Sequence, residues 1–518
     1  MNDQQREVHL RFVTSASCPL CKGTRLSQAA LSSRIDGRNI AQLAALEATE
    51  LVKVLATLQG PAARPLVASL LGRLGNLITI GLGYLSLDRE TMMLSGGESQ
   101  RIKMVRHLSS SLTEMLYVFR EPTIGLHTRD VQRLNALLLK LRDKGNTVLV
   151  VEHDRDVMQL ADHVVDMGPR AGAHGGEVVF EGLFPKLLEV DTLTARALRD
   201  ALPLKTEYRQ PTGRLTLRNA RLHNLKDVTV DIPADVLTVV TGVAGSGKST
   251  LINDVFVAQH PTAIVIDQSA VSTSSRSNPA TYTGMLDDIR QLFARANGVS
   301  ASLFSSNSEG ACPNCQGVGL IYIDLAFMEG LKSTCEVCGG KRFTQEVLRH
   351  KLRGRSISDV YEMTAGDALE FFTEKKLQTV LQALNDVGLG YLKLGQPLST
   401  LSGDECQRIK LATELHKDGS IYVMDEPTTG LHMSDVRHLL DIIERLVGQS
   451  NSVILIEHNL DVVQRADWVI DLGPEGGHQG GQVLFQGTPK DLLDCRHSLT
   501  AEYLRRHVGK ARTDAPVA

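Results

Sequence analysis

The sequence lacks any apolar run near the roughly 18 residues that a membrane-spanning helix needs. It also lacks an excess of positive charge, since 56 Lys and Arg residues face 59 Asp and Glu residues in a chain of 518, for a net charge of -3. Its polar first ten residues do not fit a secretory signal. We therefore expect a cytoplasmic protein with no membrane partner, in which any nucleic-acid-binding surface is a local patch.

A second phosphate-binding loop is also missing, although the motifs that accompany such loops occur twice. Residues 242–249 form one Gly-rich loop, whereas residues 94–98 reappear as 401–405 and residues 121–123 as 426–428. Residues 150–182 align without gaps on residues 455–487. A match of that length indicates duplicated domains. The sequence therefore predicts a tandem protein whose first half is incomplete.

The local pattern predicts an α/β fold. Three β-branched runs (residues 147–151, 236–240 and 452–456) are typical of buried parallel strands, and residues 131–143 and 436–446 have helical apolar spacing. A polar, Pro- and Gly-containing segment at 200–212 indicates a boundary. We predict a first domain at 1–205 and a second at 206–508, with an inserted region at about 268–410 and a disordered tail at 509–518.

The phosphate-binding loop predicts an ATP site. It follows the strand at 236–240 and precedes a helix at Thr250, which is the context that distinguishes such a loop from a chance Gly-rich turn. Backbone N–H groups of the loop would face phosphate oxygens. Lys248 would contact the β and γ phosphates, and Ser249 would bind Mg²⁺. The candidate ATP and Mg²⁺ residues of this loop are Gly242, Gly245, Ser246, Gly247, Lys248, Ser249 and Thr250.

Polar residues that follow other apolar strands predict the catalytic groups. Residues 421–424 are mostly apolar and end in Asp425 and Glu426. We expect Asp425 to join the Mg²⁺ shell and Glu426 to orient or deprotonate the attacking water. His458 would contact the γ-phosphate, although a single histidine is more often structural. Gln268 would sense the water or the metal.

Four cysteines with metal-ligand spacing predict a structural zinc site. Cys312, Cys315, Cys335 and Cys338 give the pattern C-x2-C-x19-C-x2-C. This spacing suits a tetrahedral four-thiolate Zn²⁺ site, which leaves no open position for catalysis. Disulfide-bonded or unliganded cysteines are the alternative.

Basic residues surround the cysteines and are candidates for DNA backbone contacts. Lys332, Lys341 and Arg342 are the named candidates, and more basic residues lie at 349–355. An ordinary solvated face is the alternative interpretation.

The motifs resemble those of the ATP-binding-cassette ATPases, whose signature is LSGGE. In that family, the phosphate-binding loop of one cassette and the signature of another enclose ATP. The resemblance implies that Lys248 works with Ser95, Gly96 and Gly97 of the intact signature. Asp404 alters the second signature, and Arg120 replaces the Mg²⁺-binding aspartate in the first half. One composite site is therefore expected to be complete and the other inactive.

Further motifs resemble the UvrA family of ABC ATPases. They are residues 276–284, the cysteine module, residues 388–391, 457–461 and 471–474. The resemblance implies an ATPase, not itself a nuclease, that recognises damaged or distorted duplex DNA during bacterial nucleotide excision repair. It also implies a homodimer, the cofactors ATP, Mg²⁺ and Zn²⁺, and a UvrB-type helicase as partner.

The chain also departs from that family. The likeness begins at His9, just before the isolated pair Cys18 and Cys21, so we expect an N-terminally truncated form without the UvrB-binding insertion. The short stretch between Lys248 and Gln268 is more similar to compact UvrA-like paralogues, some of which are linked to antibiotic self-resistance. The alternatives are therefore an impaired remnant or self-resistance protein without full repair activity, and an ABC transporter ATPase, which the inserted cysteine module disfavours.

Overall fold

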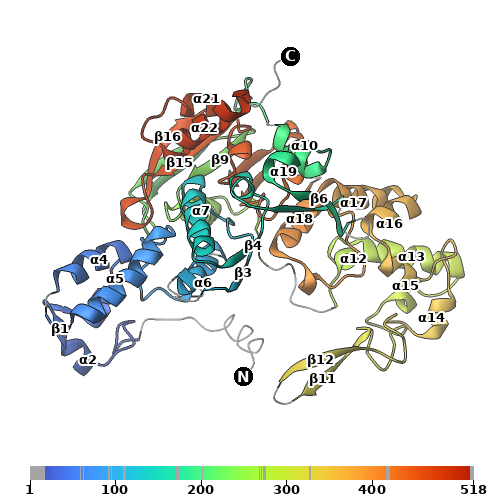
Figure 1. The fold of residues 1–518 in the computed structure, drawn as a ribbon. Helices are drawn as coiled ribbons and strands as arrows, with labels where there is room; N and C mark the ends of the chain where they lie inside the picture. The colour runs from blue at the N-terminus through green and yellow to red at the C-terminus, as the bar shows by residue number, and fades with distance from the viewer. Residues whose placement is uncertain are drawn as a thin grey trace. The chain divides into compact units, whose positions relative to one another are not determined.

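The computed structural model describes residues 18–513, apart from residues 59, 62, 92–93, 95, 109–112, 170–174, 201, 268, 270, 272–275, 326–327 and 416–419. The chain forms two compact units (Figure 1). The first contains residues up to 117 together with residues 136–149, and the second contains residues 118–135 and 150 onward. The second unit thus includes parts of the expected first domain, and the expected boundary near residue 205 stays a prediction.

The first unit is mainly helical. Its main elements are α2 (Gln28–Ser32), β1 (Arg34–Ile35), β2 (Arg38–Asn39), α3 (Ile40–Ala44), α4 (Ala48–Thr57), α5 (Arg64–Thr79) and α6 (Gly96–Leu108). Helices α4 and α5 pack through buried Leu51, Leu55 and Leu74. Pro65 lies in the first turn of α5, where proline needs no backbone donor.

The second unit is built around a six-stranded sheet in the order β10-β13-β14-β9-β15-β16. All neighbours are parallel except β15 and β16. The strands are β9 (Leu237–Gly242), β10 (Ile264–Ile266), β13 (Ile421–Asp425), β14 (Ser452–Ile456), β15 (Trp468–Gly473) and β16 (Gln482–Gly487). Every residue of β9 and β14 is buried, as expected of strands covered on both faces.

Helices and short strands complete this part of the chain. After residue 212, β7 (Arg214–Ala220) and β8 (Val228–Pro233) form an antiparallel pair. After β9 come the π-helical η3 (Thr250–Phe256) and α11 (Val257–Gln259), and α19 (Met433–Gly448) follows β13. The last helix, α22 (Leu499–Thr513), continues to Thr513 and so enters the segment that the sequence assigns to a disordered tail. None of the helices described is long and apolar enough to cross a membrane.

The first half repeats four of these strands without joining them into one sheet. Its strands are β3 (Leu116–Arg120), β4 (Thr147–Val151), β5 (Val164–Gly168) and β6 (Glu177–Gly182), and α7 (Thr128–Asp143) connects β3 with β4. They form two separate two-stranded sheets. In the second half, β9 lies between β14 and β15; among the described residues, no strand takes that place in the first half.

The missing neighbour leaves apolar side chains exposed. Met167 of β5 is 59% exposed, whereas its equivalent in β15, Leu472, is 1% exposed. The repeated sequence therefore retains a strand pattern whose burial depends on a central strand, which the described residues provide in the second half and not in the first.

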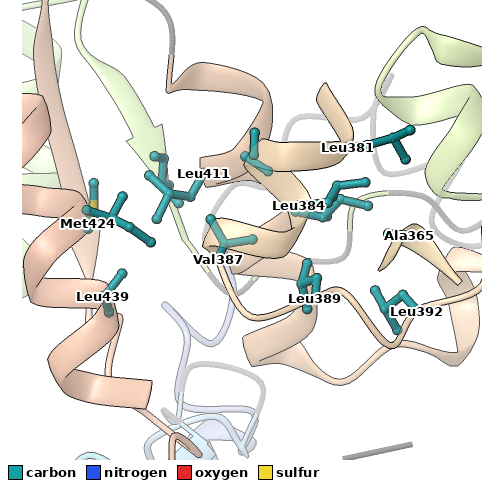
Figure 2. Packing of buried hydrophobic residues seen from close by; sticks show 14 of the residues in the cluster. Ala365, Leu381, Leu384, Val387, Leu389, Leu392, Leu411, Met424 and Leu439 are labelled. Carbon is teal, nitrogen blue, oxygen red and sulfur yellow. The ribbon is translucent and has the colours of Figure 1, made fainter. Parts of the chain in front are cut away.

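The inserted region is a helical module that shares one core with the sheet. Its main elements are α12 (Pro279–Tyr282), α13 (Met285–Asn297), α14 (Gln345–Arg349), α15 (Ile357–Glu362), α16 (Ala365–Phe371), α17 (Lys375–Asp386) and α18 (Gly403–Glu414). Figure 2 shows Leu381 and Leu384 of α17 in the same cluster as Leu411 of α18 and Met424 of β13. The module is thus packed directly onto the strand that carries the acidic pair.

Candidate nucleotide-binding and metal sites

The phosphate-binding loop joins β9 to η3, as predicted. Its glycines have backbone angles that other residues rarely adopt, with φ of +133° at Gly242 and +100° at Gly247. A Cβ atom at Gly242 would lie 2.0 Å from the Leu472 carbonyl oxygen, so β9 can approach β15 only with glycine there. The helix expected at Thr250 is present with wider π-type hydrogen bonding. The Ser246 hydroxyl is buried without a partner in the described chain, which fits a loop that receives an external ligand.

Lys248 lies at the centre of an acidic environment. Its Nζ donates to the carbonyl oxygens of Gly242 and Val243, at 3.1 Å and 3.0 Å. Burial lowers the pKa of Lys248, and the nearby carboxylates of Glu426 and Asp425 oppose that effect. A bound phosphate would add negative charge at this position and stabilise the ammonium form.

The acidic pair lies at the end of β13. The Asp425 carboxylate accepts a hydrogen bond from Asn253 of η3, at 2.8 Å, and burial raises its pKa. Glu426 has φ of +47°, an unusual angle for glutamate, and its Oε1 is 3.7 Å from Nε2 of His458. Asp425 thus faces η3, the helix that follows the phosphate-binding loop, and a cation would lie between Asp425 and the start of that helix. Glu426 faces His458.

A buried carboxylate fixes the loop that presents His458. Glu457 is 3% exposed and accepts hydrogen bonds from the backbone N–H groups of His458 (2.7 Å), Asn459 (3.0 Å) and Thr428 (3.0 Å). It therefore ties the end of β14 to the turn after Glu426. Glu152 makes the equivalent bonds in the first half, so the repeat preserves this geometry.

Residues of the first half line the same cleft as Glu426 and His458. The cleft has a volume of about 500 Å³. A Cβ atom at Gly125 would lie 3.0 Å from Oε2 of Glu426, and one at Gly430 would lie 3.1 Å from Oε2 of Glu121. The ring of His127 lies edge-on to that of His458, with centroids 6.0 Å apart. Burial lowers the pKa of His127 to about 3, so its ring is neutral near pH 7.

Some predicted residues fall outside this geometry. Gln268 and Ser95 lie outside the described residues. Gly96 and Gly97 begin α6 in the first unit. The expected pairing of Lys248 with this signature stays a prediction.

The structure describes both residues that are expected to inactivate the second composite site. Arg120 stands at the position of Asp425 and has a side chain that is 80% exposed, with Nε 3.7 Å from Oε1 of Glu121. Asp404 lies in the first turn of α18 and forms an ion pair with Arg408, at 3.0 Å. Their effect on a nucleotide stays a prediction.

The four cysteines meet as a metal site requires. Their Sγ atoms all lie within 4.8 Å of one another and the residues are buried. The Sγ atoms of Cys312 and Cys335 are 4.0 Å apart, and those of Cys315 and Cys338 are 3.7 Å apart. A tetrahedron with Zn–S bonds of about 2.3 Å has edges of about 3.8 Å, so the residues fit Zn²⁺.

Hydrogen-bond donors around the sulfurs favour thiolates. Asn314 donates to Cys335 Sγ at 3.3 Å, and the N–H of Gly319 donates to Cys315 Sγ at 3.2 Å. The bond from Asn314 is the largest cause that lowers the pKa of Cys335 to about 6, whereas burial raises that of Cys338 to about 12. A divalent cation would complete this set of donors.

The three basic candidates near the cysteines differ in accessibility. Lys332 and Lys341 are exposed. Arg342 instead donates to the Gly395 carbonyl at 2.8 Å and lies over the ring of Tyr361. The geometry therefore favours the two lysines for contact with a polyanion, and a structural role for Arg342.

Three residues that support the site were not predicted from the sequence: Asn253, Gln407 and Glu457. The buried Gln407 side chain donates to the carbonyls of Ile266 and Asp425, at 3.1 Å and 2.9 Å. Only Glu457 had a usable signal, because it recurs as Glu152. The other two act through contacts between distant segments.

Asp154 follows His153 in the first half, and a substitution there tests how burial affects the pKa of its carboxyl group. Burial is the main cause that raises the pKa of Asp154 to about 7, and Asn459 stands at the equivalent position. The folded state thus holds a proton that the unfolded state releases, and stability falls as pH rises from about 4 to about 7. We expect Asp154→Asn to stabilise the protein by about 1 to 3 kcal/mol at pH 8.

The measurement is urea unfolding of the full chain at pH 4 and pH 8. The difference between wild type and Asp154→Asn should disappear at pH 4. Asp143→Asn, which changes an exposed carboxylate of the first half, serves as the control. A difference independent of pH would contradict the assignment.

The parallel sheet, the phosphate-binding loop on its inner strand β9 and the acidic pair on β13 define a cassette of the ATP-binding-cassette class. In agreement, the family described as "ABC transporter" matches residues 225–429. UvrABC system protein A of Thermus thermophilus is 47% identical over 545 residues, covering 97% of this chain and 57% of the relative. That of Aquifex aeolicus is 44% identical, covering 98% and 60%.

The crystal structure of UvrA2 from Deinococcus radiodurans matches with a TM-score of 0.91 and 39% identity. The match covers 98% of this chain and 68% of the UvrA2 chain. The chain belongs to the UvrA family. It spans somewhat under two thirds of the length of the curated relatives named above.

Proposed function

We propose that this protein is an ATP-dependent DNA-binding protein that recognises damaged or distorted duplex DNA in nucleotide excision repair. The observation that carries the proposal is the arrangement of Lys248, the acidic pair and His458 in the second half. There Lys248 lies within the field of Asp425 and Glu426, and His458 lies 3.7 Å from Glu426. Membership of the UvrA family supports the link to DNA repair.

The residues of the site divide the work of hydrolysis. Lys248 and the backbone N–H groups of the loop bind the phosphates of ATP. Ser249 and Asp425 would hold Mg²⁺, which would offset the charge of those phosphates. Glu426 orients the attacking water and accepts its proton, and His458 contacts the γ-phosphate. Gln268 is proposed to report the water or the metal to the helical module.

The signature of the first half supplies the other side of the proposed site. Gly96 and Gly97 begin α6, where free N–H groups favour an anion, and Ser95 precedes them. Arg120 and Asp404 make the second composite site inactive in this proposal.

The cysteine module is proposed to bind Zn²⁺ and to support DNA binding. Its metal has a structural role, since four thiolates fill a tetrahedral shell. The exposed Lys332 and Lys341 would contact the DNA backbone in a sequence-independent way. We further propose a cytoplasmic homodimer. A UvrB-type helicase is its proposed partner, which fits relatives named as protein A of the UvrABC system.

ATP hydrolysis by the purified chain tests this function, with and without duplex DNA carrying a bulky adduct. Lys248→Ala should reduce turnover at least about 100-fold, because it removes the charge that holds the β and γ phosphates. Adduct-bearing DNA should change the wild-type rate, and undamaged duplex should change it less. Equal rates in wild type and Lys248→Ala would contradict the proposal and favour a non-catalytic remnant.

A further inference from the structure

We propose that residues 473–481, between β15 and β16, form a strap that orients the phosphate-binding loop. We further propose that Arg129 of the first half holds this strap through Glu475. Arg129 would then be a positioning residue for nucleotide binding in the second half. This inference rests on the proposed ATP site.

The strap is bonded directly to the loop. The N–H of Gly477 donates to the Gly245 carbonyl at 3.0 Å, and the N–H of Gly481 donates to the Ser246 carbonyl at 3.1 Å. The Asn224 side chain donates to the carbonyls of both Gly245 and Gly477, at 2.9 Å and 3.2 Å. The strap therefore holds the carbonyl groups of two consecutive loop residues, Gly245 and Ser246.

Holding these carbonyls fixes the direction of the loop donors. In a trans peptide, the C=O and the N–H point in opposite directions. The Gly245 carbonyl faces the strap, so the N–H of Ser246 points away from it, toward the Val243 carbonyl, to which it donates at 3.2 Å. The Ser246 carbonyl fixes the direction of the N–H of Gly247 in the same way. The N–H of Gly247 is a donor that a phosphate-binding loop turns toward its anion.

Close packing leaves the strap little freedom. A Cβ atom at Gly480 would lie 3.2 Å from Cα of Ser246 and 2.3 Å from the Glu475 carbonyl oxygen. One at Gly481 would lie 1.9 Å from the Asn224 carbonyl oxygen. A shift of the strap is therefore transmitted to the loop.

An ion pair connects the strap to the first half. Nη1 of Arg129 lies 2.9 Å from each carboxylate oxygen of Glu475. The Arg129 side chain is only 16% exposed, and its Nε lies 3.7 Å from the buried carboxylate of Asp130. Asp130 limits the rotation of the guanidinium, so Arg129 presents its charge to Glu475 in a fixed direction.

The repeat shows that this pair is specific to one side. Ser434 stands at the position of Arg129 in the second half, and Arg170 stands at the position of Glu475 in the first. Neighbouring motifs are repeated, whereas this pair is not. The Arg129–Glu475 ion pair thus occurs at the strap that contacts the phosphate-binding loop, and the equivalent positions of the repeat do not have it.

Titration of the full chain with a fluorescent ATP analogue, under conditions without hydrolysis, tests the proposal. We expect Arg129→Ala and Glu475→Gln each to raise the Kd about 3- to 10-fold. The turnover rate at saturating ATP should change less than about 2-fold, since Glu426 and His458 are untouched. The charge exchange, Arg129→Glu with Glu475→Arg, should recover at least part of the affinity. Lys393→Ala, which removes an exposed ion pair with Glu362, is the control.

An unchanged Kd in both single variants would overturn the proposal, as would the same change in Lys393→Ala. Loss of turnover with an unchanged Kd would also overturn it. Lys248→Ala separates this failure from that of the proposed function. If wild type binds the analogue and Lys248→Ala does not, the ATP site is present and only the strap proposal fails. If wild type does not bind, both proposals fail.

Discussion

Replacing Glu426 with Gln is expected to lower ATP turnover by about 100- to 10,000-fold while leaving ATP binding within about 3-fold of wild type. The change keeps the size of the side chain and removes the group that accepts the proton of the attacking water. Glu426 lies 3.7 Å from His458 and next to Asp425, and it lines the cleft of about 500 Å³. Lys248 and the loop N–H groups, which bind the phosphates, remain in place.

Glu121→Gln is the matched control, because Glu121 has the same place and the same left-handed backbone angle in the first half. The neighbouring residue there is Arg120 rather than Asp425, so we expect a change of less than about 3-fold. Both variants should be assayed for hydrolysis and for binding of a fluorescent ATP analogue. Equal losses in the two variants, or full activity in Glu426→Gln, would show that the catalytic group lies elsewhere.

Replacing Cys335 with Ser is expected to remove one zinc ion per chain and to unfold the cysteine module locally. The sulfurs of Cys312, Cys315 and Cys338 would then lack the fourth ligand of a tetrahedral site. Structural zinc in zinc-finger peptides binds with about 10 to 16 kcal/mol of apparent free energy, so its loss exceeds what local packing can replace. The buried contacts within this module are chiefly the cysteines themselves, with Ile321 packed beside them.

Metal analysis of the purified protein and limited proteolysis measure this effect. Cys335→Ser should lose zinc and become sensitive to cleavage between residues 311 and 343. ATP binding should persist, because the loop and the acidic pair belong to the separate sheet. Cys495→Ser is the control, since Cys495 lies outside the four-cysteine cluster. Full zinc content in Cys335→Ser would contradict the assignment.

The sequence was most informative where local chemistry determines structure. The runs at 147–151 and 452–456 became β4 and β14 with the predicted bounds, because β-branched residues favour strands. The predicted burial is confirmed for β14 but wrong for β4, in which no residue is buried. The predicted strand at 236–240 starts one residue later, as β9, and continues to Gly242. The four cysteines were predicted as metal ligands from their spacing alone, because the turn in each C-x2-C pair brings the two sulfurs of that pair together.

The parts that the sequence could not predict depend on contacts between distant residues. Arg129 has no counterpart in the repeat, and its partner Glu475 is far along the chain. Arg342 was predicted to face DNA as part of a basic cluster, yet it lies against Gly395 and Tyr361. Charge alone does not say which of several neighbouring basic residues packs inward.

The reciprocal approach of Gly125 to Glu426 and of Gly430 to Glu121 has a consequence for how the duplicated halves can diverge. Each half shapes the wall that faces the acid of the other. A side chain at Gly125 would push against Glu426, the acid of the proposed nucleotide site. The backbone of the first half at this position is therefore constrained by the chemistry proposed for the second half, whatever Arg120 does to the first half's own site.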